Sequence, residues 1–277
     1  MIIVSVVRNF DMYNRLVKNN YFNQGAKFVY FDNTKENKGI PERYNNFLDS
    51  YDYTKPDWFI FCHEDWEIKE NWQNRFASLD KDSLYGPVGA AGFRLLNRKT
   101  LFAIYGRIIN SNKDCSKIVM LGKCVKTGKE VQTFDCQCLI VHSDLIKKYN
   151  LRFDKNLSFD LYIEDFCANA KESFNIPSRI MQLYCQHYSF GSVQPRIYEQ
   201  LNYLRDKYKN AKLGYCSTVT GLYFGNTRNF DFNILVDYLK QKSASFFFQK
   251  KIINSDRICI KICKIKLPQF IAKVFRK

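Results

Sequence analysis

The first 62 residues alternate short apolar runs with segments of helical periodicity, and this alternation restricts the fold more than any other feature. Three runs have the β-branched, apolar composition of buried strands, at residues 2–7, 27–31 and 58–62. The segments between them, 11–23 and 41–50, carry apolar residues at helical spacing. Strands and helices that alternate over so short a length require parallel strands joined by right-handed crossovers. We therefore expect an α/β protein whose mixed, mostly parallel sheet is flanked by helices.

The later part of the chain is patterned less regularly. Residues 101–133 show poor periodicity, and we expect a hairpin or loop between residues 108 and 128. Apolar runs and helical spacing recur on either side of this region. We expect strands at 87–93, 134–142 and 180–188, and helices at 144–149, 159–173 and 198–209.

Basic residues are concentrated at the carboxyl-terminal end. Residues 240–277 contain eleven Lys or Arg and one acidic residue, so they carry +10 of the net charge of +16. Cations and isoleucines recur there on adjacent faces, as in an interfacial amphipathic helix. They are Arg257, Lys261, Lys264, Ile258, Ile262 and Ile265. We expect residues 245–277 to contact an anionic membrane surface. A helix packed on the protein itself, or against a second copy in a homodimer, fits the same pattern.

The cysteines indicate the compartment. Ten of them are scattered along the chain without a C-x-x-C pair, and several lie inside apolar runs. Such thiols are typical of a reduced, cytoplasmic protein. A strand pattern begins directly after Met1 without the pattern of a signal peptide, and no run reaches the ~18–20 apolar residues that span a bilayer. We expect a cytoplasmic protein that is peripheral on the inner face of the cytoplasmic membrane if its basic extension binds lipid.

The third apolar run, Trp58–Cys62, ends abruptly in His63, Glu64 and Asp65. Polar side chains at the tip of a buried strand cost free energy to desolvate unless a partner offsets that cost. In open α/β sheets, ligands bind at the carboxyl ends of strands. Alternate residues point the same way, so His63 and Asp65 can share one site while Glu64 faces away. Asp65 is a suitable ligand for Mg²⁺ or Mn²⁺ on a diphosphate. A solvated turn, with Asp65 capping a following helix, explains the segment equally well.

Other candidate residues are individually weaker. Glu164 and Asp165 stand among apolar residues, where burial raises the pKa of a carboxyl group and suits it to act as a general base. A carboxylate that complements a helix dipole is the simpler explanation. His187 follows a late apolar run and could ligate a metal or contact a phosphate, although a lone His is more often structural. Asp32 could accept a hydrogen bond from a ribose or base, and Arg43 could pair with a phosphate.

Taken in order, these segments resemble a glycosyltransferase of the GT-A type, similar to family 2 and to its glycosyltransferase-like branch. The resemblance covers about residues 1–195 and rests on seven motifs in the expected order. They are Ile2–Asn9 and Val29–Thr34 (first and second strands), Gly39–Asn46 (helix start beneath the diphosphate), Phe59–Asp65 (in place of DxD), Val131–Asp135 (acceptor side), Phe159–Lys171 (general base) and Gln186–Ser192 (late His loop). His63 stands where the family has the first Asp of DxD, and the QxxRW motif of processive synthases is absent.

The resemblance implies roles for particular residues. Asp165 is the expected general base, and a divalent cation, Mn²⁺ or Mg²⁺, is expected at Asp65 and His187. Asp135 and Glu164 are expected on the acceptor side. The nucleotide and diphosphate of the donor are expected to contact Val7, Arg8, Asn9, Asp32, Arg43, Asn46, His63 and Glu64.

The same resemblance implies a domain organisation and an activity. A GT-A (Rossmann-like) domain would occupy residues 1–240, with a nucleotide-binding half at 1–95 and an acceptor half at 96–240, followed by the extension at 241–277. The activity would be inverting transfer of a single sugar from a nucleotide-sugar donor to a saccharide or lipid-linked acceptor. The richness in Lys, Asn and Ile suggests an AT-rich bacterial genome, so that capsule, lipooligosaccharide or O-antigen synthesis follows by association.

Two other functions stay open. A net charge of +16 together with 18 Tyr and 24 Phe would permit nucleic-acid binding through stacking and phosphate contacts. Against it, the charge is concentrated in the extension and does not run along an aromatic face. The other alternative is a catalytically inactive, transferase-like scaffold.

Overall fold

The computed structural model describes residues 1–95, 100–190, 194–218, 221–226 and 228–253. The chain divides into two compact units, Met1–Gln241 and Lys242–Lys277. All of the candidate site residues lie in the first unit. The predicted amphipathic helix around residues 257–265 lies outside the described residues, so its membrane and homodimer contacts stay predictions.

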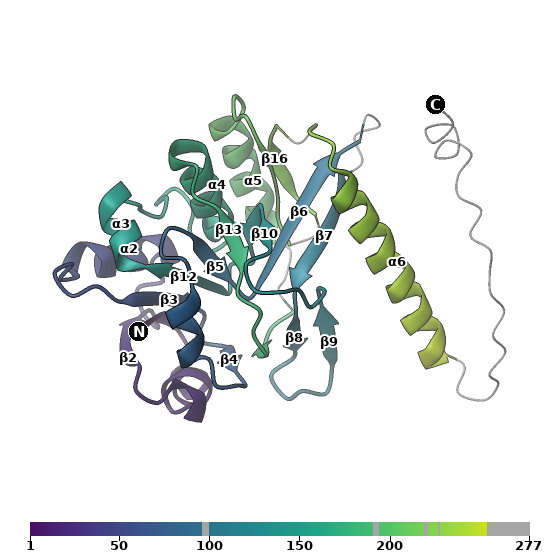
Figure 1. The fold of residues 1–277 in the computed structure, drawn as a ribbon. Helices are drawn as coiled ribbons and strands as arrows, with labels where there is room; N and C mark the ends of the chain where they lie inside the picture. The colour runs from purple at the N-terminus through teal and green to yellow at the C-terminus, as the bar shows by residue number, and fades with distance from the viewer. Residues whose placement is uncertain (96–99, 191–193, 219–220, 227, 254–277) are drawn as a thin grey trace, which may run out of the picture. The chain divides into compact units, whose positions relative to one another are not determined.

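A seven-stranded sheet forms the centre of the first unit, with the strand order β10-β13-β5-β12-β3-β1-β2 (Figure 1). Strands β1, β2 and β3 are parallel, and β12 runs antiparallel to both β3 and β5. Strand β13 is parallel to β5 and antiparallel to β10. The strands are β1 Ile2–Val7, β2 Lys27–Asp32, β3 Trp58–Cys62, β5 Leu84–Gly86, β10 Glu130–Val131, β12 Cys138–His142 and β13 Ser178–Ile180. The predicted α/β class, with a mixed and mostly parallel sheet, is confirmed.

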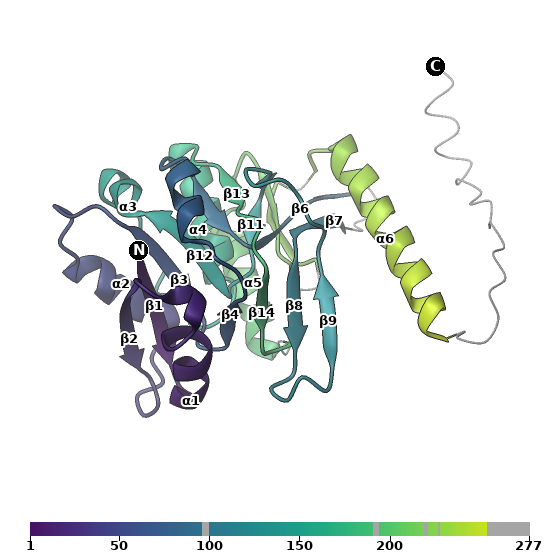
Figure 2. The same ribbon diagram turned by 60° about the horizontal axis from the view of Figure 1, so that its bottom comes forward.

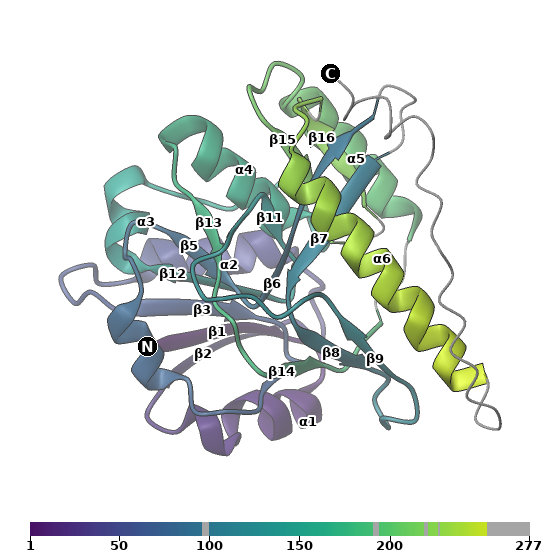
Figure 3. The same ribbon diagram turned by 45° about the vertical axis from the view of Figure 1, so that its right-hand side comes forward.

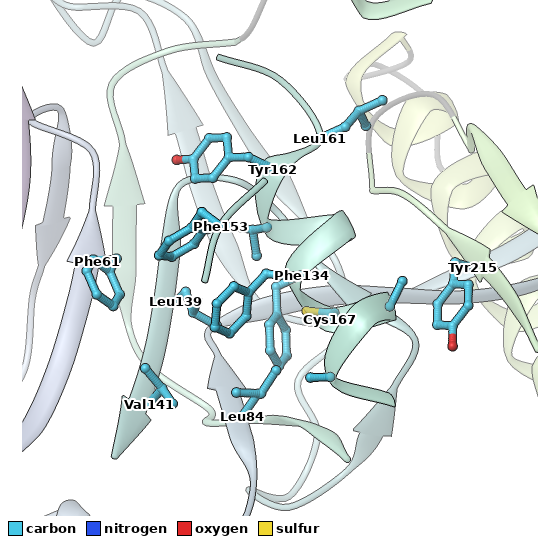
Figure 4. Close-up of a cluster of buried hydrophobic side chains, with 14 of the residues drawn as sticks. Phe61, Leu84, Phe134, Leu139, Val141, Phe153, Leu161, Tyr162, Cys167 and Tyr215 are labelled. Atoms are coloured by element: carbon cyan, nitrogen blue, oxygen red, sulfur yellow. The ribbon is translucent and has the colours of Figure 1, made fainter. Parts of the chain in front are cut away.

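Both faces of this sheet are buried, because side chains of its central strands alternate between two apolar cores. Val4 and Phe61 belong to one core, and Ile3 and Ile60 to the other. Figure 4 shows part of the first core, in which Phe134 lies close to α4. The helices are α1 Phe10–Tyr13, α2 Ile40–Ser50, α3 Ser143–Tyr149, α4 Tyr162–Phe174, α5 Pro195–Lys207 and α6 Phe232–Ile253. Because helices cover both faces, the ends of the strands are the places where polar side chains can gather.

Three smaller sheets accompany the main one, with strand orders β11-β6-β7, β4-β14-β8-β9 and β15-β16. Figure 3 shows β6 and β7 as a pair of long neighbouring strands, and Figure 2 shows β8 and β9 as a projecting hairpin beside β14. Their bounds are β4 Trp66–Ile68, β6 Val88–Arg94, β7 Thr100–Gly106, β8 Ile108–Ser111, β9 Ile118–Leu121, β11 Thr133–Phe134, β14 Cys185–His187, β15 Gly214–Cys216 and β16 Tyr223–Gly225. The hairpin expected between residues 108 and 128 is therefore β8–β9.

Two of the predicted strands are wrong in extent, because each apolar run is divided between two sheets. The run at 134–142 is interrupted by a turn in which Asp135 accepts a hydrogen bond from the N–H of Gln137, a pairing that favours turns. The run at 180–188 supplies the end of β13 to the main sheet and then β14 to the sheet of β4 and β8. Both divisions place polar residues at strand ends.

The helix predicted at 11–23 is also shorter than expected. It consists of α1, a π-helical turn at Asn14–Lys18 and a separate 3₁₀ turn at Tyr21–Asn23. The side-chain amide of Asn20 donates to the carbonyls of Leu16 and Ile68. It thereby satisfies a carbonyl of the last helical turn and ends the helix. A second 3₁₀ turn spans Gln73–Ser78.

Two other features bear on the sequence-based expectations. The eight cysteines among the described residues are all free thiols, and five of them are buried. Searched over the described residues, no helix has both the length and the apolar composition needed to cross a membrane. The start of α6 is held on β7 by a hydrogen bond from the Tyr105 hydroxyl to Asp237 and by two between the Gln241 amide and the backbone of Ile104.

Candidate functional site

Three metal-competent side chains meet where β3, β4 and β14 come together. His63 follows the last residue of β3, and Asp65 precedes the first residue of β4. His187 ends β14, where it pairs with Trp66 in the antiparallel β4–β14 ladder. Asp65 Oδ1 lies 3.2 Å from His187 Nε2 and 4.0 Å from His63 Nδ1. The fold thus brings together the two residues expected to share a site and a third from the second half of the chain.

Tyr162 fixes the orientation of the His63 ring. The Tyr162 hydroxyl donates its proton to the carbonyl of Cys136 at 2.7 Å and lies 2.9 Å from His63 Nε2. Since its one proton is already used, the hydroxyl accepts from Nε2–H of His63. Nδ1 then carries the lone pair and faces Asp65. Figure 4 shows Tyr162 at the start of α4 with its hydroxyl directed away from Phe134.

The charges in this cluster act on one another. Burial would raise the pKa of Asp65, but the charge and hydrogen bond of His187 outweigh it and lower that pKa. Burial would lower the pKa of His187, but the interactions with Asp65 outweigh it and raise that pKa. For His63 burial dominates, and its pKa is lowered. Ionised Asp65 and neutral His63 can therefore ligate a cation, whereas His187 can do so only after it loses its proton.

The cluster fits a transition-metal ion. Its three ligand atoms lie within 4.8 Å of one another. Two atoms bound to one cation at about 2.1 Å lie roughly 3–4 Å apart, so small side-chain movements would let all three share one ion. Imidazole nitrogens suit first-row transition ions, whereas Mg²⁺ prefers oxygen. Of the two predicted ions, Mn²⁺ therefore fits this donor set better than Mg²⁺.

Glu64 faces away from Asp65 and reaches the end of β1. Its Oε2 accepts hydrogen bonds from the backbone N–H groups of Arg8 and Asn9, the latter at 3.0 Å. Val7, directly before them, is buried. The N–H groups of Arg8 and Asn9, two of the predicted donor contacts, are thus occupied by a carboxylate of the protein itself. A diphosphate that used these N–H groups would have to replace Glu64.

Asp32 and Arg43 lie near each other at the end of β2. The carboxylate of Asp32 accepts hydrogen bonds from the backbone and hydroxyl of Thr34, and these lower its pKa. Arg43 pairs with Glu36 at 2.8 Å through Nη2, and the same nitrogen approaches the carbonyl of Asp32 at 3.4 Å. The Nε of Arg43 is buried and has no hydrogen-bond partner. The two residues are thus neighbours with one donor of Arg43 unused, and their contacts to a nucleotide stay a prediction.

Asn46, expected beside the diphosphate, is exposed on the surface of α2. Its neighbour Asn45 is buried and exchanges two hydrogen bonds with the backbone of Phe153. Asn45 therefore joins α2 to the segment before α4.

Asp135 lies in the turn between β11 and β12 and is half-buried. Its Oδ2 accepts a hydrogen bond from the Thr218 hydroxyl at 2.7 Å. Burial by itself favours the neutral form of both His63 and His187. The negative charge of Asp135 opposes this effect and favours the protonated form of each, which acts to raise its pKa. Among the predicted acceptor-side residues, Asp135 thus acts electrostatically on both His63 and His187.

Glu164 is fully buried in the first turn of α4. Its oxygens accept hydrogen bonds from the Cys136 thiol at 2.9 Å and from the Ser217 hydroxyl at 2.7 Å. Burial is the largest influence on this group and raises the pKa of Glu164 to about 7. The sequence-based expectation of a carboxyl with a raised pKa in this segment is met by Glu164.

Asp165 has a different environment. It is 2% exposed, and its Oδ1 accepts from Lys207 at 2.7 Å and from the Tyr208 hydroxyl at 2.9 Å. Lys207 also pairs with Asp154 at 2.6 Å. Burial raises the pKa of Asp165 although Lys207 opposes it. These contacts join α4 to α5, and a carboxylate that is 2% exposed is hard for an incoming hydroxyl to reach.

Two neighbours of the site were not identified from the sequence. One is Tyr162, which stands among the apolar residues around the acidic pair. Asp160, whose carboxylate pairs with Arg196 at 2.7 Å, adds its charge to the surroundings of His63. Between them, Leu161 adopts a left-handed conformation with φ 57°, which is costly for a side chain of this kind. Nothing in the local sequence marks this bend, which sets the direction in which Tyr162 leaves the chain.

A cavity of about 460 Å³ lies elsewhere in the first unit. Tyr105, Lys129, Gln132, Lys171 and Asp231 are among its lining residues, and none of the predicted site residues lines it. Because it holds no set of metal ligands, we assign the chemistry to the cluster at β3, β4 and β14.

No protein-family model matches the sequence, and no curated protein matches it. Similar solved structures include S. aureus TarS, with a TM-score of 0.46 and 14% identity over 76% of this chain and 40% of that chain. A structure of S. aureus TarS 1-349 in complex with UDP has a TM-score of 0.46 and 15% identity over 76% of this chain and 66% of that chain. GalNAc-T7 with UDP, GalNAc and Mn²⁺ has a TM-score of 0.44 and 11% identity over 75% of this chain and 49% of that chain. The chain spans between 40% and 66% of the length of these proteins. TM-scores below 0.5 leave the function to be argued from the residues of the site.

Proposed function

We propose that this chain is a GT-A type glycosyltransferase that transfers one sugar, with inversion, from a nucleotide-sugar donor to a saccharide or lipid-linked acceptor. The observation that carries the proposal is the convergence of His63, Asp65 and His187 beyond the carboxyl end of β3. Open α/β sheets bind their ligands at that end. A nucleotide donor would extend from this cluster toward Asp32 and Arg43 at the end of the parallel strand β2.

His63, Asp65 and His187 are the residues that would hold a divalent cation. Bound there, the cation would neutralise charge on a departing diphosphate. Tyr162 would keep Nδ1 of His63 turned toward the ion, because it occupies Nε2. Such partners of a ligand orient it and tune its basicity.

We assign the general base to Asp135 instead of Asp165. Asp135 is half-buried and acts electrostatically on both histidines, whereas Asp165 is enclosed by Lys207 and Tyr208. A base must reach the hydroxyl whose proton it takes. In this assignment Asp135 removes the proton of the acceptor hydroxyl as its oxygen attacks the anomeric carbon. Asp165 positions α4, and Tyr162 with it.

Bacterial surface-polysaccharide assembly, as in a capsule, lipooligosaccharide or O-antigen, is the pathway that we propose. It rests on the composition of the sequence and on the resemblance, not on the chemistry of the site.

Nucleotide binding tests the proposal. Thermal unfolding would be followed with UDP, GDP, CDP, dTDP or CMP, each with Mn²⁺, Mg²⁺ or EDTA. A ligand at a hundred times its Kd adds about 2.7 kcal/mol, which shifts Tm by several degrees. We expect one nucleoside diphosphate to stabilise the protein with Mn²⁺ and to lose that effect in EDTA. No shift with any nucleotide would contradict the proposal and favour an inactive scaffold or a nucleic-acid-binding protein.

A further inference from the structure

We propose that the β8–β9 hairpin docks the protein on an anionic lipid surface. Its exposed apolar residues form what we call the hairpin patch, which consists of Ile118, Val119, Met120, Leu121 and Phe190. Their side chains are exposed by 59%, 37%, 55%, 37% and 40%, respectively. Contiguous exposed apolar side chains of this kind mark interaction sites in proteins.

The position of β9 makes this exposure unusual. It is the edge strand of its sheet, and all four of its residues are exposed, so that both faces of the strand are apolar and open. Edge strands are ordinarily protected by charge, short length or cover, because their free backbone groups and apolar side chains invite association. Figure 2 shows the hairpin projecting beside β14. An apolar partner therefore has direct access to it.

The charge around the patch identifies the partner. Residues 107–121, which include the hairpin, contain the cations Arg107, Lys113 and Lys117 and a single acidic residue, Asp114. All three cations are exposed, and the ammonium group of Lys117 lies 4.8 Å from the centre of the Phe190 ring. An apolar centre with cations at its edge matches the boundary between acyl chains and anionic headgroups. A second copy would instead bring two like-charged hairpins together.

The register of the strands places this surface close to the metal cluster. Asn110 of β8 pairs with His187 on one side and with Val119 of β9 on the other. Neighbouring strands lie about 4.8 Å apart, so the backbone of β9 is roughly 10 Å from that of His187. A lipid-linked acceptor on the docked membrane would be presented beside the cluster. That consequence rests on the proposed function, whereas the docking itself does not.

Sedimentation of the full-length protein with lipid vesicles tests the proposal. The neutral vesicles would contain phosphatidylcholine alone. The anionic vesicles would contain phosphatidylcholine mixed with phosphatidylglycerol. One variant, Ile118→Ser with Met120→Ser, removes two apolar side chains that are mostly exposed to solvent. The other, Lys113→Gln with Lys117→Gln, removes two cations of the hairpin. Each charge near an anionic surface contributes about fivefold, so we expect the second variant to lower the partition coefficient on anionic vesicles by at least about tenfold.

Matched substitutions on other surfaces control for general loss of hydrophobicity or charge. Tyr21→Ser with Tyr184→Ser removes apolar residues that are exposed by 67% and 51%. Lys18→Gln with Lys27→Gln removes two exposed charges elsewhere. Both control variants should bind anionic vesicles as the wild type does. Neither should bind vesicles of phosphatidylcholine alone.

Three results would overturn the docking proposal. The wild-type protein could fail to bind anionic vesicles, or the hairpin variants could bind them as well as the wild type does. The third result is that the wild type is a dimer and that Ile118→Ser with Met120→Ser converts it to a monomer. The last would assign the patch to a second copy. None of these results depends on nucleotide binding, so they are separable from a failure of the proposed glycosyl transfer.

Discussion

The Nε2 atom of His187 lies 3.2 Å from Oδ1 of Asp65, although the two residues come from different halves of the chain. The antiparallel pairing of β4 with β14 creates this contact, because it sets His187 opposite Trp66, the residue after Asp65. The ion pair is the clearest sign that the polar strand ends form one site. It also makes the metal-binding prediction testable residue by residue.

Replacing either partner of this pair should strongly weaken cation binding at the site. We expect Asp65→Asn and His187→Ala each to weaken Mn²⁺ affinity by at least about 100-fold, because each removes one of three ligands. Isothermal titration calorimetry with Mn²⁺ alone measures this without requiring activity. Asp114→Asn, an exposed carboxylate in the hairpin, is the control and should leave the affinity unchanged. Equal affinity in all three variants would place the ion elsewhere.

The hydroxyl of Tyr162 should matter for the metal although it binds none itself. In Tyr162→Phe the aromatic ring of residue 162 remains in the core, but Nε2 of His63 loses its hydrogen-bond partner. The imidazole ring of His63 then loses its fixed orientation. We expect Mn²⁺ affinity to fall about 10-fold to 100-fold with a small change in Tm. Tyr203→Phe also deletes one hydroxyl, which contacts Asp154 and Asn156, and serves as the control. An unaltered affinity in Tyr162→Phe would remove Tyr162 from the site.

Asp135 and Asp165 can be distinguished by comparing activity with stability. Asp135→Asn should retain the fold and donor binding while lowering kcat by at least about 100-fold, as the loss of a general base does. Asp165→Asn should lower the free energy of unfolding by about 2 kcal/mol, because a buried ion pair loses one partner while Lys207 keeps Asp154. Transfer assays and urea unfolding of both variants check this. An inactive, stable Asp165→Asn protein beside an active Asp135→Asn protein would restore Asp165 as the base.

Burial of Glu164 should make stability depend on pH. Its pKa is about 7 in the folded state against an ordinary value of 4.5. The folded protein therefore holds this proton more tightly than the unfolded chain does. The stabilisation is fully present below pH 4.5 and is lost as the pH rises to about 7, by about 3 kcal/mol in total.

Glu164→Gln should escape this loss, because an amide does not ionise. We expect the free energy of unfolding of the variant, relative to that of the wild type, to increase by about 3 kcal/mol between pH 4.5 and pH 7.5. Urea unfolding at several pH values measures the difference. Glu199→Gln on the exposed side of α5 should follow the wild type throughout. A constant difference between Glu164→Gln and the wild type would show that folding does not raise the pKa of Glu164.

Much of the fold could be predicted because local patterns dominate its first third. The strands at 2–7, 27–31 and 58–62 and the helix before the third strand are found within a residue of the expected bounds. The strand expected at 87–93 is also found, as β6, but the runs at 134–142 and 180–188 could not be delimited, because an apolar run looks the same whether it stays in one sheet or crosses into another. Periodicity reports burial, and the residues of both sheets are buried.

The residues of the candidate site could likewise be predicted from the sequence only in part. The sequence alone marks His63 and Asp65 as a pair, since alternation along a strand end fixes their common direction. It also singles out Glu164 as a carboxyl among apolar neighbours. It does not distinguish Asn45, which is buried and structural, from Asn46, which is exposed, because neighbours on a helix differ in direction only once the helix has been packed.

By itself, then, the sequence determined the α/β class, the polar end of the third strand and the basic carboxyl-terminal extension. These properties follow from residues adjacent in the chain, whose spacing and chemistry act locally. The family resemblance implied a shared site for Asp65 and His187, and the tertiary structure supplied their contact. Only the tertiary structure decided that Tyr162 orients His63 and that Lys207 encloses Asp165. Each of these contacts joins segments far apart in the chain. Their positions depend on strand register and helix packing, which no short stretch of sequence specifies.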